Sequence, residues 1–329
     1  AVLTSEEVKR LFELLENLRA KGVSIVYISH RLNEIFEICD RITVLKDGTF
    51  VKTVNKSDIS EEELVNLMIG RTLDNYFPGR QHEIGEKIFE VEHIKAGHAV
   101  SDVSFNVCKG EVLGLTGLVG AGRTEAIRAI LGFDKLESGR IILRGKPVTI
   151  KSPRHAYKLK IGMLPEDRKS AGVLLKVAIK FNITLSCLPK FQNVFKWLNL
   201  KKEKEFVQKF AREIGVKGAS LDNPVNSLSG GNQQKVALAR LLASDCNILL
   251  LDEPTRGIDV GSKIEIFNLI NSLVAQNYAV VLISSEMAEI IGMCDRAVVM
   301  REGVTVGELK KSEFSEQNII KLSMGVKSS

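Results

Sequence analysis

Apolar and polar positions along the chain follow two different periods. Residues 101–107 alternate between apolar and polar side chains, which is typical of a half-buried strand. Continuous apolar runs indicate buried strands at 111–117, 247–253 and 279–285, and a shorter strand is expected before Gly145. Helical periodicity marks the segments 123–131, 152–160, 181–214 and 231–243. Strands that alternate with helices predict an α/β fold with a mostly parallel sheet and a helical insertion near 175–235.

The beginning and the end of the chain repeat one another. A shift of 255 positions aligns residues 1–70 with 256–325 without a gap, and 21 of 70 positions are identical. The block Cys39-Asp40-Arg41, for example, recurs as Cys294-Asp295-Arg296. Chance would give roughly one identity in sixteen to twenty, so we interpret the match as a duplication.

The duplication divides the chain unequally. We expect residues 86–329 to be a complete second copy and residues 1–70 to be the C-terminal part of a truncated first copy. Residues 71–85 contain Pro78 and Gly79 and are the expected linker. The first copy should repeat the final helix-strand-helix-strand pattern, and its last helix should begin with a capping box formed by Ser60 and Glu63.

A glycine-rich segment between a predicted strand and a predicted helix is a candidate phosphate-binding loop. Glycines allow backbone N–H groups to converge on phosphate oxygens, and the helix N-terminus favours negative charge. Arg123 stands where this pattern requires lysine, and the alternative is an ordinary strand-to-helix turn. The candidate nucleotide-binding residues here are Gly117, Leu118, Val119, Gly120, Ala121, Gly122, Arg123, Thr124 and Glu125.

Two further segments carry candidate chemistry. Asp252 and Glu253 end a buried strand, where an aspartate can hold Mg²⁺ and a glutamate can act as general base toward water. Alone, they could be acidic residues of a turn. A second anion-binding pattern begins 23 residues before Asp252 and could by itself be simple helix capping; its residues are Ser229, Gly230, Gly231, Asn232 and Gln233.

These three segments, in this order and spacing, resemble the ATP-binding-cassette (ABC) ATPases. GLVGAGRTE, LPEDRK, LSGGNQQK and LLLDEPTRGIDVG are similar to the second cassette of tandem-cassette subunits from bacterial monosaccharide importers of the ribose, galactose and xylose type. ISHRLNEIFEICDRITVLKDG resembles the end of the first cassette. The resemblance implies a P-loop NTPase core, an antiparallel β subdomain, a helical subdomain, and ATP with Mg²⁺ as cofactors.

The resemblance also implies roles for single residues. His30 matches the switch histidine of the catalytic site, and Ser285 takes that place in the second copy. Glu166 falls where many cassettes carry a glutamine that senses γ-phosphate and Mg²⁺, so Thr124, Asp252 and Glu166 are the expected metal ligands. Asp259 matches the aspartate of the loop that crosses between two cassettes.

In such proteins two cassettes enclose ATP, and each site combines the phosphate loop of one with the signature of the other. Arg123, Glu166 and Ser285 all depart from the usual residues, so we expect a degenerate site on the second cassette. Its signature would complete the first cassette's site. The phosphate loop and signature of the first cassette are absent from residues 1–70, so this missing half is an expected partner.

The resemblance further implies an importer subunit at the cytoplasmic face of the membrane, working with transmembrane permease subunits and an extracytoplasmic sugar-binding protein. A soluble ABC ATPase acting on nucleic acid and a non-hydrolytic regulatory cassette are the alternatives. A net charge of +6 without a basic stripe argues against a nucleic-acid partner. No apolar run reaches the ~18 residues that span a bilayer.

The remaining unusual residues are expected to be structural. The five cysteines lack CxxC spacing and indicate reduced, buried thiols. The histidines His82, His93, His98 and His155 should be surface residues, and the run 201–204 a solvated helix face. Trp197, with Phe191 and Phe195, should pack inside the helical insertion.

Overall fold

A computed structural model describes most of the chain. The described residues are 5–29, 32–46, 49–60, 63, 64, 67, 77–79, 83–217 and 220–325. The chain divides into two compact units, of which unit 1 comprises residues 1–76 with 259–261, and unit 2 comprises 77–258 with 262–329. No helix within the described ranges is long and apolar enough to cross a membrane.

Unit 1 is a small α/β unit with a two-stranded antiparallel sheet. Its elements are α1 (Ser5–Ala20), α2 (Leu32–Ile38), β1 (Arg41–Lys46), β2 (Thr49–Asn55) and the short helix η1 (Lys56–Asp58). Its core contains Ile35, Ile42, Val44 and Leu64. The predicted capping box is confirmed, because Glu63 accepts the Ser60 backbone N–H at 2.9 Å and the Glu63 N–H reaches Ser60 Oγ at 3.2 Å.

The strand expected between α1 and α2 is not formed. Residues 23–29 have no strand assignment, and Val26 and Ile28 are 90% and 93% exposed. Their counterparts in the repeat, Val281 and Ile283, lie in a strand flanked by parallel neighbours on both sides. The prediction was wrong because a strand needs pairing partners, which the described part of unit 1 does not supply to this segment.

Unit 2 contains one ten-stranded sheet with the order β7-β6-β3-β4-β12-β11-β5-β10-β9-β8. The strands β11, β5, β10, β9 and β8 are parallel to one another, whereas β7, β6, β3 and β4 pair antiparallel. The strands are β3 (Lys87–Ala96), β4 (Val100–Cys108), β5 (Val112–Gly117), β6 (Ser138–Leu143), β7 (Lys146–Val148), β8 (Ile161–Leu164), β9 (Ile248–Asp252), β10 (Ala279–Ile283), β11 (Arg296–Arg301) and β12 (Val304–Lys310). The predicted parallel core and antiparallel β subdomain are both confirmed.

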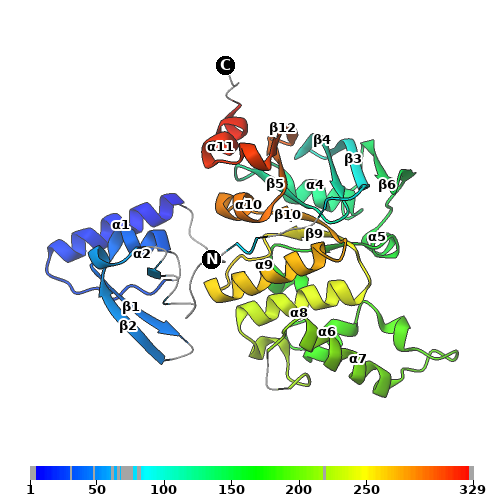
Figure 1. Cartoon of the computed structure of the whole chain (residues 1–329), viewed down its shortest axis with the longest axis horizontal. Coiled ribbons are helices and arrows are strands. Elements are labelled where there is room, and N and C mark those ends of the chain that lie inside the picture. The colour runs from blue at the N-terminus through cyan, green and yellow to red at the C-terminus, as the bar shows by residue number, and fades with distance from the viewer. Residues whose placement is uncertain are drawn as a thin grey trace. The chain divides into compact units, whose positions relative to one another are not determined.

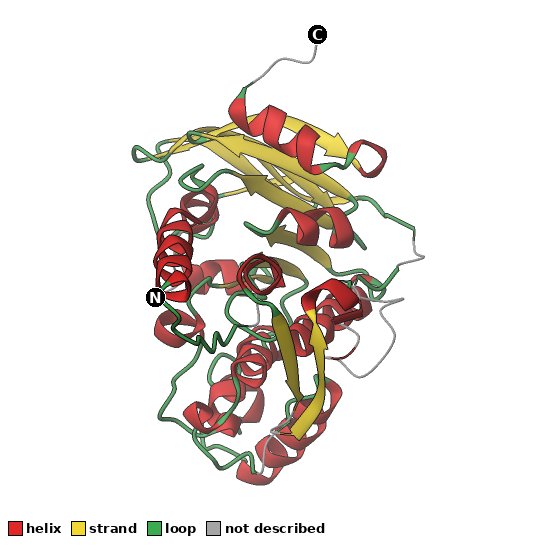
Figure 2. Ribbon diagram, turned by 90° about the vertical axis from the view of Figure 1, so that its left-hand side faces the viewer, coloured by secondary structure: helices red, strands yellow, loops and turns green. Residues whose placement is uncertain are grey.

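Helices cover this sheet and extend from one end of it (Figure 1). They are α4 (Arg123–Ile130), α5 (Pro153–Lys158), α6 (Ile179–Thr184), α7 (Leu200–Glu213), α8 (Gly230–Ala243), α9 (Val260–Val274), α10 (Met287–Met293) and α11 (Glu316–Met324). Short helical turns are η2 (Arg168–Gly172), η3 (Leu188–Phe191), η4 (Val225–Ser227) and η5 (Lys311–Glu313). In Figure 2, α11 near the C-terminus lies on the outer side of the strands. The helices α6, α7 and α8 pack together as the helical subdomain.

Two sequence predictions about the helical subdomain and the thiols need correction. The helix expected over 181–214 is interrupted between α6 and α7, where Pro189 removes a backbone donor and Lys196 has a φ of +63°.

All five cysteines are free, as expected. Cys39 and Cys108 are half-buried rather than buried.

Candidate functional site

The glycine-rich segment joins β5 to α4, and its glycines are sterically required. Gly117 and Gly122 have φ angles of +153° and +89°. A Cβ at Gly117 would lie 2.2 Å from the carbonyl oxygen of Met300, and one at Gly122 would lie 2.3 Å from that of Ala99. Only glycine fits such contacts. The loop therefore brings the N-terminus of α4 close to the β3–β4 turn, with Val119 exposed at its tip.

The loop and the strand end meet through Thr124 and Asp252. The Thr124 hydroxyl donates to Asp252 Oδ2 at 2.8 Å, across 128 residues of sequence. Burial raises the pKa of Asp252 above its ordinary range, against the opposing effect of the Thr124 hydrogen bond. Within the described residues, the buried Oδ1 of Asp252 has no hydrogen-bond partner. Hydroxyl and carboxylate oxygens are the ligands that Mg²⁺ prefers, so this pair fits a magnesium site.

Glu253 lies directly after β9 in a left-handed backbone conformation, with a φ of +47°. Its Oε1 accepts the backbone N–H of Ser285 at 2.6 Å, so the segments after β9 and β10 are tied together. Burial raises the pKa of the Glu253 carboxyl to about 7. A carboxylate with a pKa near neutrality is suited to general-base chemistry.

Arg123 is held in the same region. Its Nη1 donates to the backbone carbonyl of Ser284 at 3.1 Å, and burial lowers the pKa of the guanidinium below its usual value. The buried carboxylates Glu253 and Asp252 oppose that shift. The side chain in the lysine position therefore spans from α4 to the end of β10, where it neutralises part of the acidic charge.

Glu166 and two arginines form a second polar group beside Glu253. The Glu166 carboxylate makes an ion pair with Arg256, three residues after Glu253. Arg168 donates from Nη1 to the carbonyl of Arg256 at 2.8 Å and from Nη2 to the carbonyl of Gly257 at 3.1 Å. Sequence reasoning missed both arginines, although the LPEDRK segment already singled out position 168. Of the three expected metal ligands, Thr124 and Asp252 thus form a hydrogen bond with one another, whereas Glu166 is paired with Arg256.

The predicted signature segment begins α8, and Figure 1 shows α8 apart from α4, the helix that follows the glycine loop. Ser229 is the N-cap, and its hydroxyl oxygen accepts the Asn232 amide at 3.0 Å. A Cβ at Gly231 would lie 2.0 Å from Ser262 Oγ on α9, so this glycine permits close packing of the two helices. A Cβ at Gly230 would approach Arg168. Gln233 donates to the carbonyl of Leu228 at 3.0 Å.

A buried carboxylate that sequence reasoning also missed connects three segments around Glu253. Glu289 accepts from the Thr255 hydroxyl at 2.7 Å, the Ser284 hydroxyl at 2.8 Å and Lys263 Nζ at 3.0 Å. Lys263 also pairs with Glu286. The repeat carried the signal, because Ser29 and Glu34, the counterparts of Ser284 and Glu289, make the same 2.8 Å bond in unit 1.

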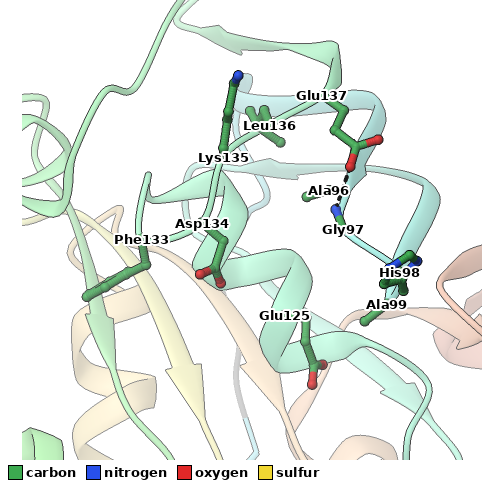
Figure 3. A pocket seen from close by; sticks show the side chains of 10 residues that line it. All are labelled: Ala96, Gly97, His98, Ala99, Glu125, Phe133, Asp134, Lys135, Leu136 and Glu137. Atoms are coloured by element: carbon green, nitrogen blue, oxygen red, sulfur yellow. Dashed lines mark hydrogen bonds between the residues drawn. The ribbon is translucent and has the colours of Figure 1, made fainter.

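An open pocket of about 880 Å³ lies beside the candidate phosphate-binding loop. Its lining comes from the β3–β4 turn, the start of α4 and the segment after α4, as Figure 3 shows. Ala99 belongs both to this pocket and to the packing around Gly122, so the two features adjoin. The segment 93–99 lacks an aromatic residue, but Phe133 supplies one to the lining. Its ring lies 5.3 Å from the Arg128 guanidinium and is turned away from His98 (Figure 3).

The other predicted residues have different outcomes. His30 and His82 lie outside the described residues. Asp259 is exposed immediately before α9. His93 and His98 are exposed as predicted, whereas His155 is half-buried.

The interpretation of the 201–204 run was wrong at Glu203, which is buried and accepts the Thr184 hydroxyl at 2.6 Å. The interpretation of Trp197 and Phe195 as packing residues was also wrong, because both are largely exposed, and only Phe191 is buried.

Comparisons with known proteins relate the chain to the ABC transporters. Residues 100–256 match the family model of the ABC transporter. A Rhizobium meliloti protein named for ribose, galactose and methyl galactoside import is 47% identical over 98% of this chain and 65% of its own length. A Bacillus subtilis "Ribose import ATP-binding protein RbsA" is 44% identical over 99% of this chain and 66% of its own length. The chain thus spans about two thirds of the length of these relatives.

Solved structures show the same fold. A nucleotide-free ATP-binding cassette from an ABC transporter superposes with a TM-score of 0.63 at 23% identity, covering 72% of this chain and 98% of that cassette. The ADP conformation of MJ1267, another such cassette, gives 0.61 at 24% identity over 73% of this chain and 99% of its own. The ABC ATPase fold predicted from the sequence is therefore confirmed.

Proposed function

We propose that this chain, which belongs to the ABC transporter family, is part of the ATP-hydrolysing subunit of a monosaccharide importer. The observation that carries the proposal is the contact between Thr124 and Asp252, which joins a glycine loop to a strand end beside Glu253. The names of the relatives support a simple sugar such as ribose as the transported substrate. Permease subunits and an extracytoplasmic binding protein would be the partners, at the cytoplasmic face of the membrane.

The nucleotide would occupy the phosphate loop and the adjoining pocket. Backbone N–H groups of residues 117–124 would bind the phosphates, and the base would extend toward Ala99 and His98. Thr124 and Asp252 would hold Mg²⁺, which neutralises charge on the phosphate oxygens when bound. Glu253 would accept a proton from the attacking water, and the Ser285 backbone N–H would keep its carboxylate in place.

We further propose that this site is slow and that the second cassette acts mainly through its signature. Arg123 extends to the carbonyl of Ser284, Glu166 is paired with Arg256, and Ser285 has no imidazole with which to contact a γ-phosphate. The signature Ser229–Gly231, at the N-terminus of a 14-residue helix, would instead bind ATP held by a first cassette. Asp259 would lie in the loop that crosses to that cassette, and His30 would serve its γ-phosphate.

Residues 1–70 would then be the C-terminal part of that first cassette, followed by a linker at 71–85 and the second cassette at 86–329. The exposed apolar segment 23–29 supports this organisation. Its counterpart β10 pairs with β5 and β9, and a shift of 255 positions puts the counterparts of those two strands before residue 1.

The test is binding and hydrolysis of Mg-ATP by the purified chain over a wide range of protein concentrations. We expect saturable ATP binding without turnover, and hydrolysis once the upstream half is added. The Glu253→Gln variant should retain ATP binding. In the Thr124→Ala variant, ATP binding should no longer depend on Mg²⁺. Absence of ATP binding would overturn the proposal. Turnover that rises with the square of concentration and is lost in Glu253→Gln would instead overturn the claim that this site is slow.

A further inference from the structure

The loop that joins η3 to α7 presents apolar side chains to solvent. We call residues 191–200 the aromatic hairpin. Val194, Phe195 and Trp197 are 91%, 78% and 75% exposed, although each would be stabilised by burial. Phe191 anchors the base of the hairpin, where its ring lies 5.2 Å from that of Phe206 on α7. Exposed apolar side chains gathered at one tip mark a surface that contacts something else.

Hydrogen bonds between its own atoms stabilise the hairpin. The Asn193 side-chain oxygen accepts the backbone N–H groups of Phe195 and Trp197, both at 3.0 Å. The Asn193 N–H donates to the Trp197 carbonyl at 2.9 Å, and the Asn199 N–H donates to the Phe191 carbonyl at 2.8 Å. Because these four N–H groups are already paired, they would stay satisfied if the tip entered an environment of low dielectric constant.

The charged residues within and immediately flanking the hairpin segment are all lysines. Between residues 187 and 202 the sequence contains four lysines and no aspartate or glutamate. Lys190 is tied to Asp245, whereas Lys196, Lys201 and Lys202 are exposed. Segments that lie at the interface between a membrane and water typically contain both aromatic residues and lysines. The lysines complement anionic lipid phosphates, which a purely apolar protein groove would not require.

We propose that the aromatic hairpin inserts into the headgroup region of an anionic lipid bilayer, with Phe195 and Trp197 at acyl-chain depth and the lysines at the phosphates. This membrane contact goes beyond the proposed ATPase function and does not depend on nucleotide. It would hold the helical subdomain against the bilayer.

Trp197 makes the proposal directly testable, because it is the single tryptophan of the chain. The probes are vesicles of phosphatidylcholine with or without phosphatidylglycerol. We expect the tryptophan emission to shift to shorter wavelength and the chain to co-sediment with the phosphatidylglycerol vesicles. Brominated acyl chains should quench the emission, and high salt should weaken binding because it screens the lysines. Unchanged emission on these vesicles would overturn the proposal, and would point instead to docking on a protein partner.

The double variant Val194→Ser/Phe195→Ser retains the reporter and should weaken binding by about tenfold or more. Phe50→Ser, at a phenylalanine of β2 that is 65% exposed, is the matched control and should leave binding unchanged. Circular dichroism will verify that both variants are folded. Equal binding by the double variant and the parent, or equal binding to neutral and anionic vesicles, would contradict the assignment.

Discussion

Val26 and Val281 occupy the same position of the internal repeat, yet Val26 is almost wholly exposed and Val281 is fully buried. The identical residue thus has two environments within one chain. Val281 lies in β10, which pairs with Leu113 on one side and Leu250 on the other. Val26 has no strand beside it in the described part of unit 1.

This difference predicts unequal effects of the same substitution. Val281→Ala should lower the free energy of unfolding by about 1–3 kcal/mol, because it leaves a cavity in a packed core. Val26→Ala should change it by less than about 0.5 kcal/mol. Urea unfolding followed by circular dichroism measures both. Similar losses would show that segment 23–29 is buried in solution. In a longer chain that carries the upstream half, we expect the two losses to become similar.

The glycine loop between β5 and α4 should tolerate no side chain at Gly122. Gly122→Ala combines a left-handed φ with a contact of 2.3 Å to the Ala99 carbonyl, so we expect a loss of more than about 2 kcal/mol of stability, together with loss of ATP binding.

The matched control is Gly145→Ala, whose φ is +74° but whose Cβ would meet nothing within 4 Å. It should cost about 1 kcal/mol and leave ATP binding intact. Equal behaviour of the two variants in thermal unfolding and ATP titration would refute the close approach at Gly122.

The raised pKa of Glu253 predicts a pH dependence of stability. The folded chain holds this proton up to about pH 7, whereas an ordinary glutamate releases it near 4.5. Protonated Glu253 therefore stabilises the folded chain at acidic pH. Its contribution to the free energy of unfolding, up to about 3 kcal/mol, is lost as the pH rises from about 4.5 to about 7.

Glu253→Gln cannot ionise and should be more stable than the parent at pH 8, but similar to it at pH 4.5. Thermal unfolding at both values measures the difference. A constant difference at the two pH values would exclude an elevated pKa.

Glu289 should be far more important for stability than Glu286, although both carboxylates pair with Lys263. Glu289 is buried and also accepts from Thr255 and Ser284, so Glu289→Gln should cost about 2–4 kcal/mol. Glu286 has a side chain that is 53% exposed, and Glu286→Gln should cost less than about 1 kcal/mol. Denaturant titration of the two variants measures both losses of stability. Comparable losses would argue against a central structural role for the Glu289 carboxylate.

Much of the architecture could be predicted from local sequence. Apolar runs predicted β5, β9 and β10 within one or two residues, because a strand buried on both faces must be apolar throughout. The capping box at Ser60 was predictable for a similar reason, since it involves atoms only three residues apart. The glycine pattern and the acidic pair after an apolar run likewise predicted the loop and the strand end that meet at Thr124 and Asp252.

Tertiary structure alone decided the rest, because burial and ion pairing depend on residues distant in sequence. Nothing local distinguishes Phe191, which is packed, from Phe195, which faces solvent. Glu166 forms an ion pair with Arg256, which is 90 positions away in sequence, and Glu289 accepts hydrogen bonds from three segments. The sequence by itself thus determined the cassette core and its candidate nucleotide loop. The tertiary structure decided which apolar residues remain exposed and which carboxylates are neutralised. Both depend on whether distant residues come together, and at Val26 no strand among the described residues pairs with the segment.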